Sequence, residues 1–173
     1  MMKQRTWFDR VFSLGHPVDA FPEILERLRG TPARLEERVA HVGSTVGTRR
    51  IDEAWSIHQQ VGHLCDLETL WTGRLNDLLI GAERLGAADL KNEATQSAGH
   101  DDVEMCVLLL RFRRLRADLV RRLEGLEDGD LARTALHPRL EQPMSTVDLF
   151  FFVAEHDDHH LASITRLLTG ADR

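Results

Sequence analysis

Three histidines stand together late in the printed sequence, in the segment Glu155-His156-Asp157-Asp158-His159-His160. The chain has nine histidines in 173 residues, so this grouping is dense. On a helix, residues four apart share one face with Cβ atoms about 5–6 Å apart, so His156 and His160 would be stacked and could direct ring nitrogens at one point. Apolar residues continue this face on both sides, and the spacing therefore predicts a histidine pair that points into the protein interior. His159 lies about 100° around the helix from His160 and is a weaker ligand candidate.

Two inward imidazoles need partners, because a buried polar group left unpaired costs about 1–3 kcal/mol. A divalent metal ion would satisfy both rings, with His63 as the best further donor from another helix. Gly62 next to it leaves room for a close approach. Three imidazoles form a neutral ligand set with open coordination positions, which suits activation of water or binding of an anionic substrate atom. Zinc is the first expectation because imidazole suits it, but nickel, iron and manganese are not separated by sequence. The alternatives are an exposed or hydrogen-bonded histidine pair and a His63 that is satisfied within the core.

Few other residues suggest chemistry. Asp157 and Asp158 are interpreted as the solvated side of their helix, or one of them as an acceptor for an imidazole N–H. Glu68 lies five positions after His63, about 140° around a helix from it, and is not securely placed as a base. No catalytic residue is assigned. The remaining histidines fall on expected loops or polar faces and are interpreted as surface residues: His16, His41, His58, His100 and His137.

Four helical segments must position these residues, and strand-like alternation is not evident. The first runs from about Val18 to Val42, interrupted at Gly30 and restarted by Thr31-Pro32. The second begins at Ser56, whose spacing to Gln59 is that of a capping box, and carries the apolar stripe Ile57, Val61, Leu64, Trp71, Leu75 and Leu78. The third is capped by Asp101 or Asp102, with Val103, Val107, Leu110, Leu115, Leu119 and Leu123 as core candidates. The last starts at Ser145 or Thr146, runs to about Leu168 and ends at Gly170.

These stripes predict an all-α fold, a four-helix bundle with long connections at residues 81–99 and 125–143, in which the last helix is the longest. Such long connections argue against the simplest up-down-up-down arrangement. The length of 173 residues fits a single domain over residues 1–173.

Composition and charge exclude several classes of function. The formal net charge of −6 gives no global positive field for nucleic acid. No signal peptide is evident and no apolar run approaches the roughly 20 residues that span a bilayer, so no membrane partner is expected. The two cysteines, Cys65 and Cys106, share no metal-ligand spacing and indicate a reducing compartment. We therefore expect a cytoplasmic protein.

The segments around these histidines resemble the DinB/YfiT-like family over nearly the whole chain. The resemblance rests on Leu28–Pro32, on Trp55-Ser56-Ile57 leading to Val61-Gly62-His63-Leu64 with Asp66 and Glu68, on His137-Pro138-Arg139-Leu140 with Pro143-Met144, and on the stretch from Phe152 to Ile164. Its most specific element is one histidine on the second helix combined with H-x-x-x-H on the last. The resemblance implies a four-helix bundle that binds a divalent metal, usually zinc or nickel, through His63, His156 and His160.

The same resemblance implies small-molecule chemistry. Some relatives are S-transferases or isomerases that use low-molecular-weight thiols, and one type is regarded as a metal-dependent hydrolase. A thiol-dependent S-transferase is favoured, with a small-molecule substrate and a low-molecular-weight thiol cosubstrate. The alternatives are a hydrolase that uses a metal-bound water, and a non-catalytic, metal-stabilised binding protein.

Apolar residues beyond one stripe per helix predict a homodimer. Phe150 and Phe151 flank the inward line of the last helix, and Leu108 and Leu109 flank the Val107–Leu110 line of the third. Bulky apolar side chains on an outward face favour a partner surface. The alternative is that the two long connections fold over these positions.

Overall fold

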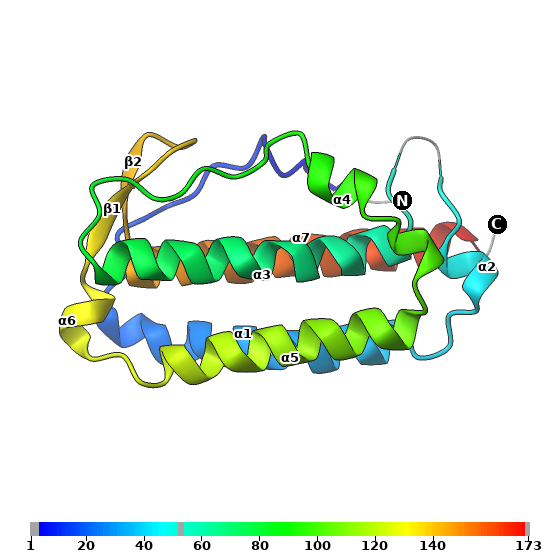
Figure 1. Ribbon diagram of the computed structural model, residues 1–173, viewed down its shortest axis with the longest axis horizontal. Coiled ribbons are helices and arrows are strands. Elements are labelled where there is room, and N and C mark those ends of the chain that lie inside the picture. Colours follow the sequence, from blue (N-terminus) through cyan, green and yellow to red (C-terminus); the bar gives the residue numbers. More distant parts are fainter. Residues whose placement is uncertain (1–3, 52–53, 172–173) are drawn as a thin grey trace.

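In a computed structural model that describes residues 4–51 and 54–171, four long helices form a bundle (Figure 1). The predicted all-α four-helix bundle is confirmed. Helix α7 is the longest element with 26 residues, as expected for the last helix. The four helices are α1 (Phe21–Val39), α3 (Ile57–Leu79), α5 (Met105–Leu123) and α7 (Thr146–Ala171).

The order of the helices in space differs from their order in the sequence. Helices α1 and α3 each pack against both α5 and α7, so the consecutive helices α1 and α3 lie diagonally. In Figure 1, α3 and α5 run in the same direction, and the chain between them returns along the whole length of the bundle. The segment before α1 crosses the same upper face. Two long segments therefore cover the face formed by α3 and α7.

Short elements occupy the connections, and two of them are strands that the sequence did not predict. β1 (Thr134–His137) pairs with β2 (Gln142–Ser145) as an antiparallel hairpin, with Thr134 opposite Ser145 and His137 opposite Gln142. The strands escaped prediction because each has only four residues and β2 contains a proline. The remaining short elements are η1 (Val18–Ala20), α2 (Ser44–Gly47), α4 (Glu93–Ser97), η2 (His100–Asp102) and α6 (Asp128–Leu131).

Helix α1 is continuous, so the predicted interruption at Gly30 is wrong. Pro32 lies inside the helix, where its missing N–H leaves the carbonyl of Leu28 without its helical donor. Nη1 of Arg116 on α5 donates to this carbonyl at 3.4 Å. The helix continues because a side chain from another helix replaces the missing bond, which local sequence signals cannot show.

The helix starts were predicted with mixed success. The capping box of Ser56 and Gln59 at the start of α3 is confirmed, and the predicted stripe of that helix is buried. Ser145 precedes α7 and exchanges hydrogen bonds with Asp148, whose backbone N–H donates to the Ser145 hydroxyl at 3.0 Å. The prediction for α5 is wrong, since Glu104 is its N-cap and Asp101 instead accepts a hydrogen bond from the hydroxyl of Ser56.

The buried face of α5 also differs from the prediction in its first half. Val107 and Leu110 are 53% and 57% exposed, whereas Leu108 and Phe112 are buried. The prediction failed because the charged Arg116 belongs to the buried face, so that this face does not show a continuous apolar pattern in the sequence.

The phenylalanines that suggested a homodimer are covered within the chain. Phe150 is fully buried, and Phe151 packs against the ring of His16 at 4.1 Å between centroids and against the guanidinium of Arg27. The homodimer stays a prediction, with Val107 and Leu110 on α5 as its exposed apolar surface. No helix among the described residues is long and apolar enough to cross a membrane.

Candidate metal centre

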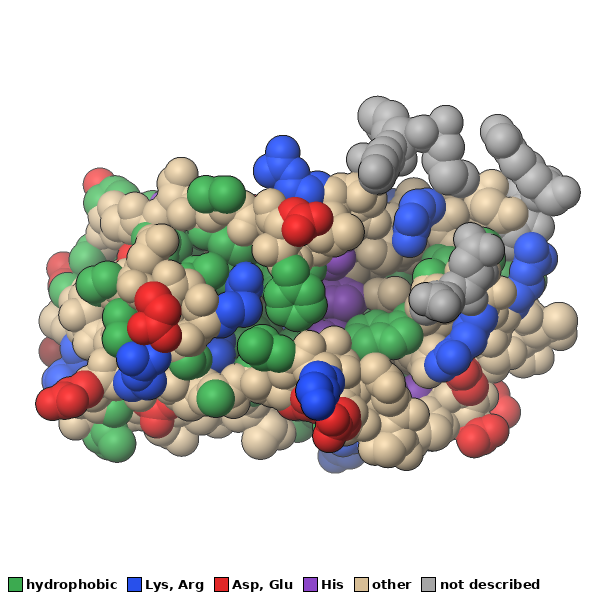
Figure 2. All heavy atoms as spheres, turned by 90° about the horizontal axis from the view of Figure 1, so that it is seen from above, with side chains coloured by type: hydrophobic (Ala, Val, Ile, Leu, Met, Phe, Trp, Pro, Cys, Tyr) green, Lys and Arg blue, Asp and Glu red, His purple; other side chains and the backbone are tan. Residues whose placement is uncertain are grey.

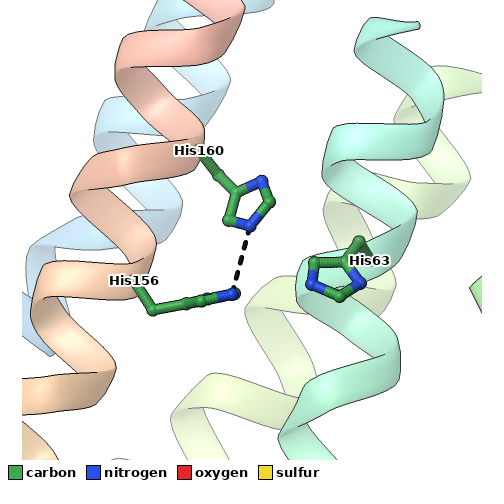
Figure 3. Close-up of side chains that lie close together, drawn as sticks. All are labelled: His63, His156 and His160. Atoms are coloured by element: carbon green, nitrogen blue, oxygen red, sulfur yellow. Dashed lines mark hydrogen bonds between the residues drawn. The ribbon is translucent and has the colours of Figure 1, made fainter. Parts of the chain in front are cut away.

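Three histidines from two facing helices converge in the interior (Figure 3). His63 comes from α3, and His156 and His160 lie one turn apart on α7. One ring nitrogen of each lies within 4.8 Å of those of the others, and all three side chains are buried. The structure therefore brings together all three residues singled out from the sequence.

A chain of hydrogen bonds fixes the protonation of His63. Its Nδ1 lies 3.0 Å from the hydroxyl of Thr95, which itself donates to Oδ2 of Asp66 at 2.9 Å. Because the single hydroxyl proton is used on Asp66, the hydroxyl accepts from His63 Nδ1–H. The lone pair of His63 is therefore on Nε2. This shell of residues around a ligand is what orients imidazoles in metal sites.

The same Asp66 carboxylate accepts from Nε2 of His100 at 2.8 Å. The ring of His100 packs directly over Gly62, where a Cβ atom would lie 2.2 Å from it. Gly62 does permit a close approach, as predicted, and the approaching group is His100.

The ring nitrogens of His160 and His156 lie at a spacing that fits two ligands of one metal ion. Nδ1 of His160 donates to Oε1 of Gln60 at 2.5 Å, so its lone pair is on Nε2. This Nε2 lies 3.1 Å from Nε2 of His156, whose Nδ1 is buried without a partner among the described residues. Two nitrogens that bind one tetrahedral zinc at 2.0–2.1 Å lie about 3.3 Å apart. The spacing and the donor set both fit a metal ion.

Burial keeps these imidazoles in the neutral form that binds metals. It lowers the pKa of His63 to about 4, with Asp66 acting in the opposite direction. The pKa values of His156 and His160 are lowered well below 6.5, first by burial and then by the neighbouring histidines.

A cavity of about 560 Å³ opens above the three histidines (Figure 2). All three tryptophans of the chain line it, although sequence reasoning gave them no role in the site. The ring centroid of Trp7 lies 4.9 Å from that of His156, and Trp55 lies 4.8 Å from His63. The N-terminal segment at residues 4–8 and the connection at residues 87–90 supply further walls. The histidines therefore lie at the base of a largely aromatic pocket.

Three histidines interpreted as surface residues are buried, and that interpretation is wrong for them. His58 bonds through Nδ1 to the carbonyl of Val103 at 3.0 Å, His100 bonds to Asp66, and His137 contacts Arg74. The other two differ: His41 is exposed as predicted, whereas His16 is half-buried against Asp148. The buried ones were missed because their partners come from segments distant in sequence.

The acidic residues near the histidines form ion pairs with arginines. Asp157 is fully buried and accepts from Arg116 and from the hydroxyl of Thr31, so it is neither solvated nor an imidazole acceptor. Glu68 is buried against the same Arg116 at 2.5 Å. Asp158 pairs with two arginines of α1, Arg27 and Arg34.

Comparison with known proteins assigns the family. A model of the DinB superfamily matches residues 27–164. The chain belongs to the DinB superfamily. A search of curated proteins finds no match.

Two solved structures are similar to this member of the superfamily. One is YfiT from Bacillus subtilis, described as a probable metal-dependent hydrolase with an unusual four-helix bundle topology, with a TM-score of 0.83, 19% identity and 94% of each chain covered. The other is a mycothiol-dependent maleylpyruvate isomerase, with a TM-score of 0.67 and 11% identity over 86% of this chain and 62% of that one. At these identities, the similarities show the shared fold.

Proposed function

We propose that this DinB-superfamily protein is a metal-dependent enzyme of small-molecule chemistry, in which His63, His156 and His160 hold one divalent ion. The contact between the Nε2 atoms of His156 and His160 carries the proposal, because it places two nitrogens of neutral rings at ligand spacing. Zinc is the expected ion, and nickel, iron and manganese accept the same imidazole donors. The description of YfiT as metal-dependent supports the same conclusion.

Elemental analysis of the purified protein tests the ion site. We expect about one ion per chain in the unaltered protein, and loss of the ion in His156→Ala and His160→Ala. His41→Ala is the matched control, because that histidine is exposed and outside the cavity. Circular dichroism establishes that each variant is folded. Equal metal content in all four proteins would reject the site.

Thiol-dependent S-transfer is the reaction that the cavity favours. A divalent ion bound here would lower the pKa of a coordinated thiol or water. Among the described residues that line the cavity, Asp89 is the only carboxylate, and its oxygens accept from the backbone N–H groups of Lys91 and Ala94. A thiol, with an ordinary pKa near 8.5, needs no separate base, whereas water benefits from one.

The thiol would come from a small molecule. Cys65 is buried outside the cavity lining, where burial raises its pKa to about 12, and Cys106 is exposed on α5. Neither can present a thiolate to the histidines. The aromatic walls, including Trp7 and Trp71, would exclude water from the reacting groups while Gln60 and Thr95 keep the imidazoles oriented.

Hydrolysis is the second candidate, because the structure similar over 94% of this chain is described as a probable hydrolase. A panel of electrophiles assayed with and without low-molecular-weight thiols separates the two reactions. Turnover that requires both thiol and metal supports S-transfer. Turnover of esters or amides without thiol, abolished by chelation, supports hydrolysis. Ligand binding without turnover supports the non-catalytic alternative.

A further inference from the structure

One end of the cavity holds two arginines that form no ion pair with a carboxylate of the described residues. Arg74 on α3 is buried, and Arg139 lies in the turn of the β-hairpin; both line the cavity. Nη2 of Arg139 is buried without a hydrogen-bond partner in the described part of the chain. Arg74 donates through Nε to the carbonyl of Gly86 at 2.9 Å, and its Nη1 lies 3.1 Å from Nε2 of His137.

Hydrogen-bond donors exceed acceptors at this end. The backbone N–H groups of Arg139 and Leu140 both point at Nδ1 of His137 at 3.2 Å, while Arg74 donates to the other nitrogen of the same ring. A neutral imidazole has only one acceptor nitrogen, so one of these donors is unsatisfied. A group with two or more acceptor atoms would complete the arrangement.

The positive charge at this end is only partly compensated. Burial lowers the pKa of Arg74 to about 10; the charge of Asp77 acts against this lowering, and the charge of Arg139 acts in the same direction as burial. The buried Arg116 elsewhere in the bundle shows the contrast, because two carboxylates and a carbonyl contact its guanidinium. Buried charges in proteins are usually paired, and within the described residues the two arginines at the cavity end have no contacting carboxylate such as those that Arg116 has.

The two ends of the cavity are joined by aromatic rings. The centroid of Phe152 lies 5.3 Å from that of His137 and 6.3 Å from Trp71, and Trp71 lies 5.7 Å from His156. A small molecule held by the arginines would extend across these rings toward the three histidines. A cavity of about 560 Å³ is in the range of small-molecule sites.

We propose that Arg74 and Arg139 form a binding site for a carboxylate, which anchors an organic acid with its apolar part against Phe152 and Trp71. An arginine fork matches the two oxygens of a carboxylate, and charge-assisted bonds of this kind are strong. The site accepts the acid without metal or thiol. The proposal rests on the proposed function in one respect. If that function holds, the bound acid is the substrate, or the carboxylate belongs to the cosubstrate thiol.

Binding of 3-phenylpropionate to chelator-treated protein tests the proposal, measured by tryptophan fluorescence because all three tryptophans line the cavity. The neutral isostere 3-phenylpropanamide is the control ligand. We expect the acid to bind at least tenfold more tightly than the amide, with one molecule per chain. Equal affinity for the two compounds would overturn the proposal.

Variants locate the binding to the arginines. Arg139→Gln should remove the preference for the acid, and Arg139→Lys should retain part of it. The half-buried Arg139 can be replaced with less risk to folding than the buried Arg74, and thermal unfolding checks each protein. The matched control is Arg166→Gln, an exposed arginine at the margin of the same cavity. If Arg166→Gln lost as much of the preference for the acid as Arg139→Gln, the preference would come from the overall positive charge of the protein, and the site would be rejected.

The design separates this proposal from the metal centre. His156→Ala, which should not hold an ion, should still prefer the acid over the amide, so loss of the metal and loss of the carboxylate site are read independently. Comparison of 3-mercaptopropionate with 2-mercaptoethanol then shows whether the carboxylate belongs to the thiol. Tighter binding of the thiol acid, in addition to the preference for 3-phenylpropionate, shows that the site also accepts a thiol that carries a carboxylate. Equal binding of the two thiols assigns the site to the acid substrate alone.

Discussion

Replacing Arg116 by methionine should destabilise the protein far more than any surface arginine on the same helix. The guanidinium of Arg116 is buried and contacts Glu68 on α3, Asp157 on α7 and the carbonyl of Leu28 on α1. Arg116→Met would leave two carboxylates facing each other without a cation. Breaking a buried ion pair costs about 3–5 kcal/mol of unfolding free energy. With a urea m-value of about 2 kcal/mol/M, the unfolding midpoint should fall by about 1.5–2.5 M.

The control for this variant is Arg113→Met. Arg113 lies on the same helix and pairs with Glu36 through two hydrogen bonds at 2.6 Å, but both side chains are more than one-third exposed. Exposed pairs contribute about 0–1 kcal/mol, so this variant should change little. Urea unfolding followed by circular dichroism measures both. Midpoints that agree within experimental error would refute the role given to burial.

The pH dependence of the Arg116→Met variant adds a second readout. Burial already raises the pKa of Glu68, and Arg116 acts against this rise. Without the arginine, the pKa of Glu68 in the folded state would rise further above its value in the unfolded state. The variant should therefore be least destabilised near pH 4.5 and should lose stability relative to the unaltered protein as the pH rises. Destabilisation that does not vary between pH 5 and 8 would contradict this account of Glu68.

Three further predictions concern the ligands, the histidines and the assembly. Gln60→Leu removes the acceptor of His160 Nδ1–H and should weaken metal binding about 10- to 100-fold in a chelator competition, whereas unchanged affinity would dismiss this role of Gln60. The pKa values of His63 and His137 are about 4 in the folded metal-free protein and near 6.5 in the unfolded chain. The free energy of unfolding should therefore be retained above pH 6.5 and decline as the pH falls toward 4, and a thermal unfolding midpoint that stays constant from pH 7 to 5 would contradict this prediction. Light scattering should give a dimer mass that Leu110→Asp converts to a monomer mass, and a monomer mass for the unaltered protein would end the dimer prediction.

The sequence was most informative where one helix carried the whole signal. His156 and His160 are one turn apart, so helical periodicity alone predicted that they would share a face and point inward. The capping box at Ser56 is likewise local to a single helix start. His63 was a weaker inference, because its approach to α7 depends on how two helices pack, and the family resemblance strengthened it.

What the sequence did not show depends on contacts between distant segments. Arg116 was not singled out from the sequence, because its partners come from three other helices. The continuity of α1 through Pro32 depends on the same arginine. Trp7 and Arg139 line the cavity because the N-terminal segment and the β-hairpin turn fold over the bundle. No periodicity within one helix contains that information.

The ion-pair network and the histidine site share their helices, and this links stability to chemistry. On α7, His156 and Asp157 are neighbours about 100° apart around the helix, one directed toward the histidine cluster and the other toward Arg116. On α3, His63 likewise points toward the histidine cluster, and Glu68 points toward Arg116. One guanidinium thus contacts both helices that supply the ligands, and it fixes their rotation from outside the cavity lining. Glu68 and Asp157 are thereby paired with Arg116, and the three neutral imidazoles face the cavity, where a divalent ion would be bound.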